Sequence, residues 1–132
     1  MDLHTALLAH VERAHADDLV RAPQLTQDAL TLALKNGVMI NIRYAAPDAY
    51  SLRWQPSTTD AGVEIGIDTA PTHPHLATSP NHLHLLDGRV VADPLTRIDD
   101  APEDNLSAVI TAVLAAGATW FTLRKTAPSA AP

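Results

Sequence analysis

Four of the chain's seven histidines lie in the segment between residues 68 and 84, and three prolines lie among them. Histidine is the side chain whose ordinary pKa lies nearest to neutral pH, and its imidazole is a frequent metal ligand. Proline fixes the backbone angle φ and removes a hydrogen-bond donor, so it stiffens the segment that contains it. The composition therefore predicts a prepared site, suited to either acid–base or metal chemistry.

The spacing of His82 and His84 predicts that both side chains lie on one face of a strand, because residues two apart project to the same side. A same-face pair of this kind can hold one metal ion, and His73, His75 and Asp68 could complete the ligands of zinc, nickel or copper. Without a metal, the histidines could act as general acid and general base near neutral pH. The simplest interpretation is that these are ordinary polar residues facing solvent. The residues alone do not decide between a metal site, an acid–base site and this simpler interpretation.

Two arginines are expected on the same polar face as Asp68. If the strands between residues 38 and 68 form a meander, Arg43 and Arg53 project from that face. A guanidinium matches the geometry of phosphate oxygens, so both are candidates for binding a phosphate. Cross-strand salt pairs with Glu64 and Asp68 are the simpler interpretation, and the pattern alone favours them.

The composition predicts a single domain over residues 1–125 with a mobile tail over 126–132. The chain has 132 residues, of which 46% are hydrophobic and 4% aromatic, so aliphatic side chains must form the core. A net charge of −6 argues against broad electrostatic binding of nucleic acid, although a local basic cleft is compatible with it. The absence of cysteine excludes disulfides and thiolate sites. With no signal peptide and no apolar run near the roughly 18 residues of a membrane span, a cytoplasmic protein with no membrane partner is expected.

A β-hairpin is predicted over residues 29–44. With a three-residue loop over 35–37, every facing pair is apolar on both strands. These pairs are Leu34 with Val38, Leu32 with Ile40 and Leu30 with Ile42. A two-residue loop would mix polar and apolar residues on each face, because a slip of one residue flips every side chain. The hairpin is therefore expected to have Gly37 in the left-handed region as part of a G1 bulge.

Further strands are predicted over residues 50–55, 63–68 and 82–86, with a short one over 89–91. In the first of these, Tyr50 and Trp54 alternate with polar residues. Both rings could stack on bases. However, they are expected on the same face of the strand as Leu52, which makes core packing the favoured interpretation.

Helices are predicted at both ends of the chain. The first covers residues 2–18, and His4, His10 and His15 are expected on its surface. The second begins near Pro102 and ends at Gly117, and residues 118–123 form one more strand or a packed extension. The predicted fold class is therefore α+β, with a twisted antiparallel sheet of about five to six strands and an N-terminal and a C-terminal helix.

Several short runs between residues 50 and 91 resemble, in order and spacing, the core of the TumE-like family of small toxin proteins from bacterial toxin–antitoxin modules. The runs are Tyr50-Ser-Leu-Arg-Trp54, Ile67-Asp-Thr-Ala-Pro71, His73-Pro-His75-Leu, Pro80-x-His82-x-His84 and Asp87-Gly-Arg-Val-Val91. Departures from the family's pattern mark a divergent member. Gly66-Ile67 stands in place of Arg-Tyr, Thr69 in place of Asn, Asn81 in place of His and Leu83 in place of Lys.

The resemblance implies a toxin that is paired with an antitoxin protein, and we expect this toxin to act on RNA as a ribonuclease that needs no metal. In that interpretation the catalytic residues are Asp68, His73, His82 and His84, and the substrate-binding residues are Arg43, Arg53 and His75. Two alternatives stay open: a non-catalytic protein-binding module, and a protein that binds a divalent transition metal at His73, His75, His82 and His84. A homo-oligomer is also compatible with the sequence.

Overall fold

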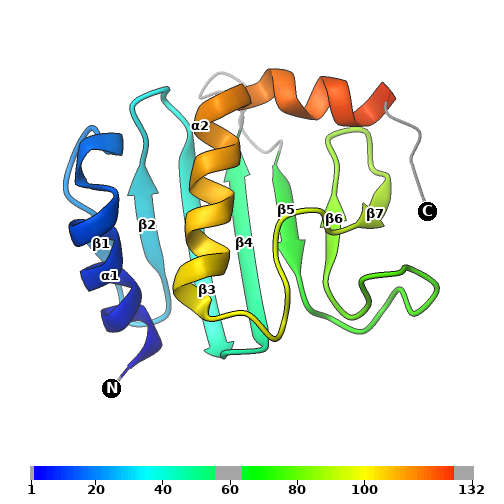
Figure 1. Ribbon diagram of the computed structural model, residues 1–132, viewed down its shortest axis with the longest axis horizontal. Helices are drawn as coiled ribbons and strands as arrows, with labels where there is room; N and C mark the ends of the chain where they lie inside the picture. Colours follow the sequence, from blue (N-terminus) through cyan, green and yellow to red (C-terminus); the bar gives the residue numbers. More distant parts are fainter. Residues whose placement is uncertain (1, 56–63, 127–132) are drawn as a thin grey trace.

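The computed structural model describes residues 2–55 and 64–126, and their side chains as far as residue 115. Seven strands form one antiparallel sheet whose spatial order follows the chain order, from β1 at one edge to β7 at the other (Figure 1). In chain order the elements are α1 (Leu3–Ala14), the 3₁₀-helix η1 (Ala16–Asp18), β1 (Gln24–Leu25), β2 (Leu30–Ala33), β3 (Met39–Ala46), β4 (Ala49–Gln55), β5 (Ile65–Asp68), β6 (His82–His84), β7 (Val90–Ala92) and α2 (Pro102–Thr126).

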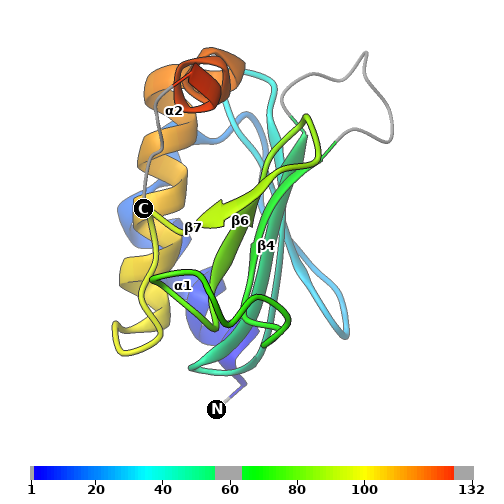
Figure 2. The same ribbon diagram turned by 90° about the vertical axis from the view of Figure 1, so that its right-hand side faces the viewer.

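Both helices cover the same face of the sheet, and in the described part of the chain no helix lies on the other face (Figure 2). The core lies between these two layers. It is formed by apolar side chains of both helices and by the inward residues of β2 to β6. Tyr50 and Trp54 belong to it, with 4% and 1% of their surface exposed, which confirms the prediction of core packing. The strand residues that alternate with these core residues project from the opposite face of the sheet, which we call the open face. This face carries the polar row that the strand pattern predicted.

The α+β class is confirmed, but within the described residues the sheet has seven strands instead of five to six. The additional strand is β1, which pairs with β2 through Gln24 and Leu25. Two residues are too short to show an alternating pattern, so the sequence carried no signal for this strand.

The predicted hairpin register is confirmed between β2 and β3, where Leu30 faces Ile42 and Leu32 faces Ile40. The N–H of Leu34 donates to the carbonyl of Val38, at 2.9 Å, and closes the three-residue loop. Gly37 has a φ of 90°, in the left-handed region, as predicted. Apolar matching across the two strands was enough to fix this register.

The predicted end of the second helix was wrong. α2 continues through Gly117 to Thr126, so residues 118–123 are helical and not a strand. A glycine inside a helix costs only about 1 kcal/mol relative to alanine, and packing can override that cost. Figure 1 shows that α2 changes direction along its length. Of the predicted tail, Thr126 ends α2 and residues 127–132 lie outside the described part of the chain.

The expectation of surface histidines on the first helix was also wrong. His4 and His15 are buried, with 6% and 9% exposure, and the backbone N–H of Tyr44 donates to Nε2 of His4 at 2.9 Å. His10 and His15 both contact Oγ of Ser107 in α2, at 2.7 and 2.8 Å. His4 shares the buried face of α1 with the core residues of that helix. A histidine that bonds a backbone group can therefore occupy a core position that apolar patterning assigns to the surface.

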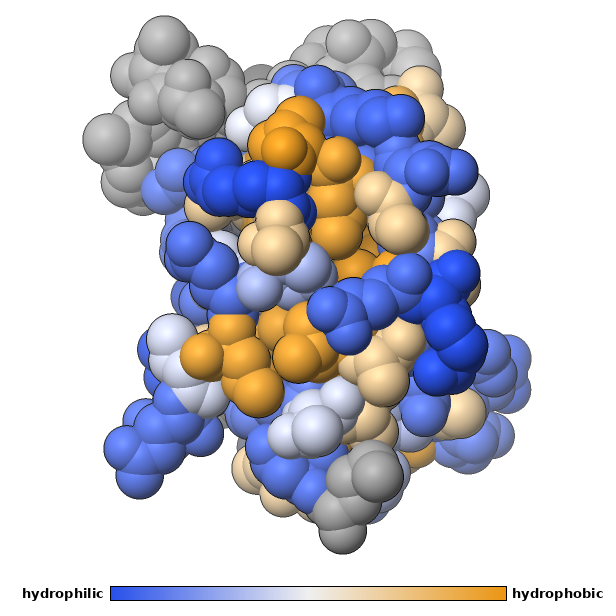
Figure 3. All heavy atoms as spheres, turned by 90° about the vertical axis from the view of Figure 1, so that its left-hand side faces the viewer, coloured by the Kyte–Doolittle hydropathy of each residue, from blue (hydrophilic) through white to orange (hydrophobic). Residues whose placement is uncertain are grey.

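The sheet ends at β1 with apolar side chains in contact with solvent. Val20 is 57% exposed and Leu25 is 41% exposed, and Figure 3, which faces this side, shows apolar surface among polar residues. Scattered apolar side chains are common on protein surfaces, so this edge by itself assigns no function. No helix in the described part of the chain is long and apolar enough to span a membrane.

Candidate functional site

The pairing of β4, β5 and β6 sets two rows of side chains side by side on the open face. In one row Ser51 faces Asp68, which faces His82. In the next row Arg53 faces Gly66, which faces His84. Antiparallel pairing brings directly opposed residues within about 5 Å of one another, so this register places two histidines and one carboxylate in a single cluster.

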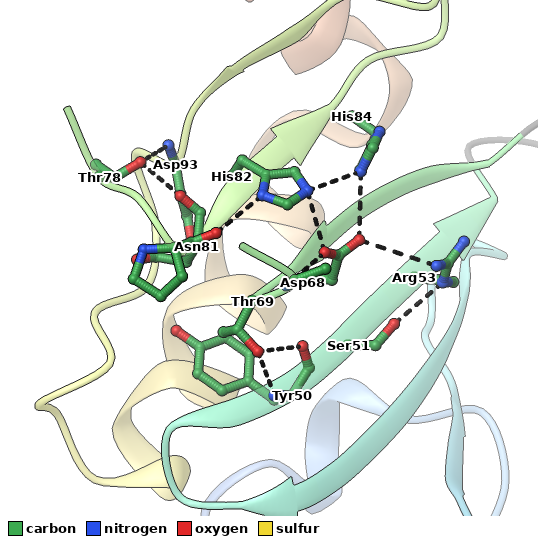
Figure 4. A network of polar contacts seen from close by, with 12 residues as sticks. Tyr50, Ser51, Arg53, Asp68, Thr69, Thr78, Asn81, His82, His84 and Asp93 are labelled. Carbon is green, nitrogen blue, oxygen red and sulfur yellow. Dashed lines mark hydrogen bonds and ion pairs between the residues drawn. The ribbon is translucent and has the colours of Figure 1, made fainter. Parts of the chain in front are cut away.

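The donor atoms of this cluster converge closely (Figure 4). Nε2 of His82 lies 3.0 Å from Oδ1 of Asp68, and Nε2 of His84 lies 3.2 Å from Oδ2 of the same carboxylate. The two Nε2 atoms are 3.0 Å apart. We call Asp68, His82 and His84 the histidine–aspartate cluster.

His82 is the buried member of the cluster, with its side chain 1% exposed. Its Nδ1 lies 2.9 Å from the carbonyl oxygen of Pro80, and since a carbonyl only accepts, Nδ1 carries a proton and donates it. The ring of His73, from the proline-rich loop, packs against it with centroids 4.8 Å apart. The loop thus fixes the orientation of His82 and directs its Nε2 at Asp68.

His84 is the exposed member, with 42% of its side chain accessible, whereas Asp68 is only 16% exposed. Burial lowers the pKa of His84, while the negative charge of Asp68 acts in the opposite direction. The carboxylate is held further by the backbone N–H of Ala70, which donates to Oδ1 at 3.0 Å. A substrate in solvent could therefore reach His84, with Asp68 behind it.

Arg53 is a cation beside the cluster. Its Nη2 lies 3.9 Å from Oδ2 of Asp68 and its Nη1 lies 4.0 Å from Oε1 of Glu64, which confirms the predicted cross-strand pairs for Arg53. A Cβ atom at Gly66 would lie 3.2 Å from Cγ of Arg53. The missing side chain of Gly66 therefore leaves the space in which the arginine stem lies.

Arg43 and His75 lie outside the cluster. Arg43 is exposed on β3 opposite Ser51, one strand further from Asp68, and its Nε donates to Oδ1 of Asn41 at 3.3 Å. His75 is exposed, and its ring is 6.0 Å from that of His73 between centroids. Within the described residues, the group whose donor atoms all lie within 4.8 Å of one another contains Asp68, His82 and His84 but neither His73 nor His75. The structure thus brings together only part of the predicted site.

Comparison with known families extends the resemblance from these short runs to most of the chain. A family model described as "Toxin TumE" matches residues 4–116. The chain belongs to the TumE toxin family. The matched residues include every member of the cluster, the proline-rich loop and Arg53. No curated protein and no solved structure matches the chain.

A buried polar network beside the cluster was missed by the sequence reasoning. Asn81, 4% exposed, donates through Nδ2 to Oδ2 of Asp93 at 2.9 Å and to the carbonyl of Thr96 at 3.0 Å. Asp93 also accepts the backbone N–H groups of Leu95 and Thr96, at 2.8 and 3.1 Å. The hydroxyls of Thr96 and Tyr50 are 2.8 Å apart. This network anchors the residue that precedes His82.

One local signal could have revealed part of that network. Asp93 is followed by proline and, three residues on, by a threonine, which is a composition typical of side chain-to-backbone turns. The partner Asn81 carried no such signal, because it meets Asp93 only after β6 and β7 have paired.

Proposed function

We propose that this TumE-family protein is a toxin that cleaves RNA by general acid–base catalysis at the histidine–aspartate cluster, with no metal ion required. The observation that supports the proposal best is the Asp68 carboxylate held between two imidazoles, one buried and one open to solvent. This arrangement supplies a positioned base on an accessible face.

His84 is the proposed general base. When neutral, it donates its Nε2 proton to Asp68 and keeps a lone pair on Nδ1, the ring nitrogen directed away from the carboxylate. A carboxylate that fixes the tautomer and stabilises the imidazolium is the arrangement that activates histidine in Ser-His-Asp hydrolases. His82 is too deeply buried to touch a substrate, so in this proposal it positions Asp68.

In the proposed reaction, Nδ1 of His84 takes the proton of a ribose 2′-hydroxyl, and the 2′-oxygen attacks the adjacent phosphorus. The bond from phosphorus to the 5′-oxygen breaks, and His73 gives that oxygen a proton. The products are a 2′,3′-cyclic phosphate and a free 5′-hydroxyl. His73 fits the acid role because it is partly exposed and its ring centroid is 6.2 Å from that of His84.

Arg53 is the proposed group that stabilises the charge of the transition state. Its side chain is 51% exposed, so the guanidinium can exchange Asp68 for a phosphate oxygen, and such electrostatic contacts are a large part of catalysis. Arg43, one strand further away, would only strengthen RNA binding. Arg53→Gln should therefore reduce the cleavage rate more than Arg43→Gln does.

The central test compares purified wild type with His84→Ala on RNA in the presence of EDTA. Removing a general base should lower the cleavage rate by about a hundredfold or more, and an RNA with a 2′-deoxyribose at the cleavage position should resist. His10→Gln, which removes a histidine from α1, is the matched control and should cleave like wild type. Intact RNA with the wild type, or an equally active His84→Ala, would refute the proposed chemistry.

The family also supports an antitoxin partner, and a growth test separates a toxin from a passive binding module. Expression of the chain alone should arrest growth, and co-expression of the product of the adjacent gene should restore it. A His84→Ala variant that arrests growth as strongly as wild type would favour the non-catalytic alternative.

A further inference from the structure

We infer that Asp68, His82 and His84 also bind a divalent transition metal ion of the zinc class, and that the bound ion switches off the acid–base centre. The assignment of the metal site depends only on geometry. The inhibitory effect rests on the proposed function.

The distances within the cluster are those that a bound ion requires. With bonds of about 2.0–2.1 Å from zinc to nitrogen or oxygen, tetrahedral geometry places ligand atoms about 3.3 Å apart. The two Nε2 atoms are 3.0 Å apart, and they lie 3.0 and 3.2 Å from different oxygens of the Asp68 carboxylate, His82 from Oδ1 and His84 from Oδ2. One ligand atom from each of the three residues lies within 4.8 Å of the other two, so a side-chain adjustment would bring all three to metal-binding separations.

The direction of the lone pairs supports a cation at this point. Because Nδ1 of His82 donates its proton to the Pro80 carbonyl, Nε2 of the neutral ring presents a lone pair to a carboxylate oxygen at 3.0 Å. Two such acceptors repel each other unless a proton or a metal ion lies between them, and a metal ion would take the place of the proton through which His82 holds Asp68. A backbone carbonyl on the second nitrogen is also the usual support of a metal-binding histidine.

The ligand set and its scaffold indicate an exchangeable zinc-class ion. Two imidazoles and one carboxylate suit zinc and neighbouring transition metals, unlike the all-oxygen sets of magnesium and calcium. All three ligands lie on paired strands, where Asp68 faces His82 directly. Three protein ligands leave a fourth position for water, and the exposure of His84 places that position towards solvent.

Metal binding would remove the proposed base through the tautomer of His84. A neutral imidazole carries one proton, and a metal that binds the Nε2 lone pair leaves this proton on Nδ1. The nitrogen that faces the substrate then has no lone pair, and Asp68 is occupied by the ion. A bound metal ion and the use of His84 as the base are therefore mutually exclusive at this site.

Calorimetry with zinc, on protein purified without a histidine tag and stripped with EDTA, tests the site. Wild type should bind one ion per chain, and His84→Ala and Asp68→Asn should each bind at least about tenfold more weakly. His10→Gln should bind like wild type, and circular dichroism checks that each variant is folded. Cobalt(II) should give the visible absorption of a four-coordinate site in wild type and in His10→Gln, but not in His84→Ala or Asp68→Asn.

Cleavage of RNA by the same samples tests the inhibition. Zinc at saturation should abolish cleavage by wild type, and EDTA should restore it. Absence of zinc binding, or equal binding by His84→Ala, would overturn the metal site whatever the cleavage result. Cleavage that persists with the site filled, or that requires zinc, would overturn the inhibitory role. One-site binding by a protein that never cleaves RNA would refute the proposed function and leave the metal site standing.

Discussion

Replacing Asn81 by alanine should destabilise the protein strongly, because this side chain links two segments inside the buried network. Its amide donates one hydrogen bond to the Asp93 carboxylate and one to the carbonyl of Thr96. A hydrogen bond to a charged group contributes about 1.5–3 kcal/mol and one to a neutral group about 0.5–1.5 kcal/mol. With Asn81 only 4% exposed, water cannot replace the lost donor. The expected loss in the free energy of unfolding is therefore about 2–4 kcal/mol.

Urea denaturation of Asn81→Ala and of a matched control measures this loss. Asn41→Ala removes the same side chain from the open face, where its amide makes two long contacts, one of 3.4 Å with Thr31 and one of 3.3 Å with Nε of Arg43. The control should lose less than about 1 kcal/mol, with an unchanged dependence on urea concentration. Equal losses in the two variants would refute the assignment of the network as a structural anchor. Since Asn81 precedes His82, Asn81→Ala should also reduce RNA cleavage under conditions where it is still folded.

Three further changes probe other parts of the fold. Gly37→Ala should cost about 1 kcal/mol because its φ of 90° strains any residue with a Cβ, whereas Lys35→Ala in the same loop should be nearly neutral in urea denaturation. His4→Leu should cost about 1–3 kcal/mol by leaving the buried N–H of Tyr44 without its acceptor, and a loss of less than 0.5 kcal/mol or so would contradict that role. Burial raises the pKa of Tyr50 to about 12. The folded state then holds the phenolic proton more tightly than the unfolded state, so stability should be complete below about pH 10 and fall as the pH rises towards 12. Tyr50→Phe should weaken this loss of stability at high pH. An identical pH dependence in wild type and variant would contradict its assignment to Tyr50.

Local patterns predicted those parts of the fold in which neighbouring residues contain the whole signal. The apolar pairs on either side of Gly37 determined the register of the hairpin, and alternation along the next strand placed Tyr50 and Trp54 in the core. The same local rule failed where a distant contact decided the outcome. His4 is buried because the backbone of β3 gives it a hydrogen bond, and α2 continues past Gly117 although a glycine often ends a helix.

The sequence by itself identified the residues of the cluster as candidates, because alternation along a strand places His82 and His84 on one face and the family motifs include Asp68. Only the tertiary structure decided how these side chains meet. Thirteen residues lie between Asp68 and His82 in the sequence, and the antiparallel pairing of β5 with β6 sets them directly opposite each other. The same pairing covers His82 with the loop and leaves His84 open, which distinguishes the buried nitrogen from the accessible one. Side-chain types and faces follow from local geometry, whereas proximity across strands and burial depend on contacts between segments far apart in the chain.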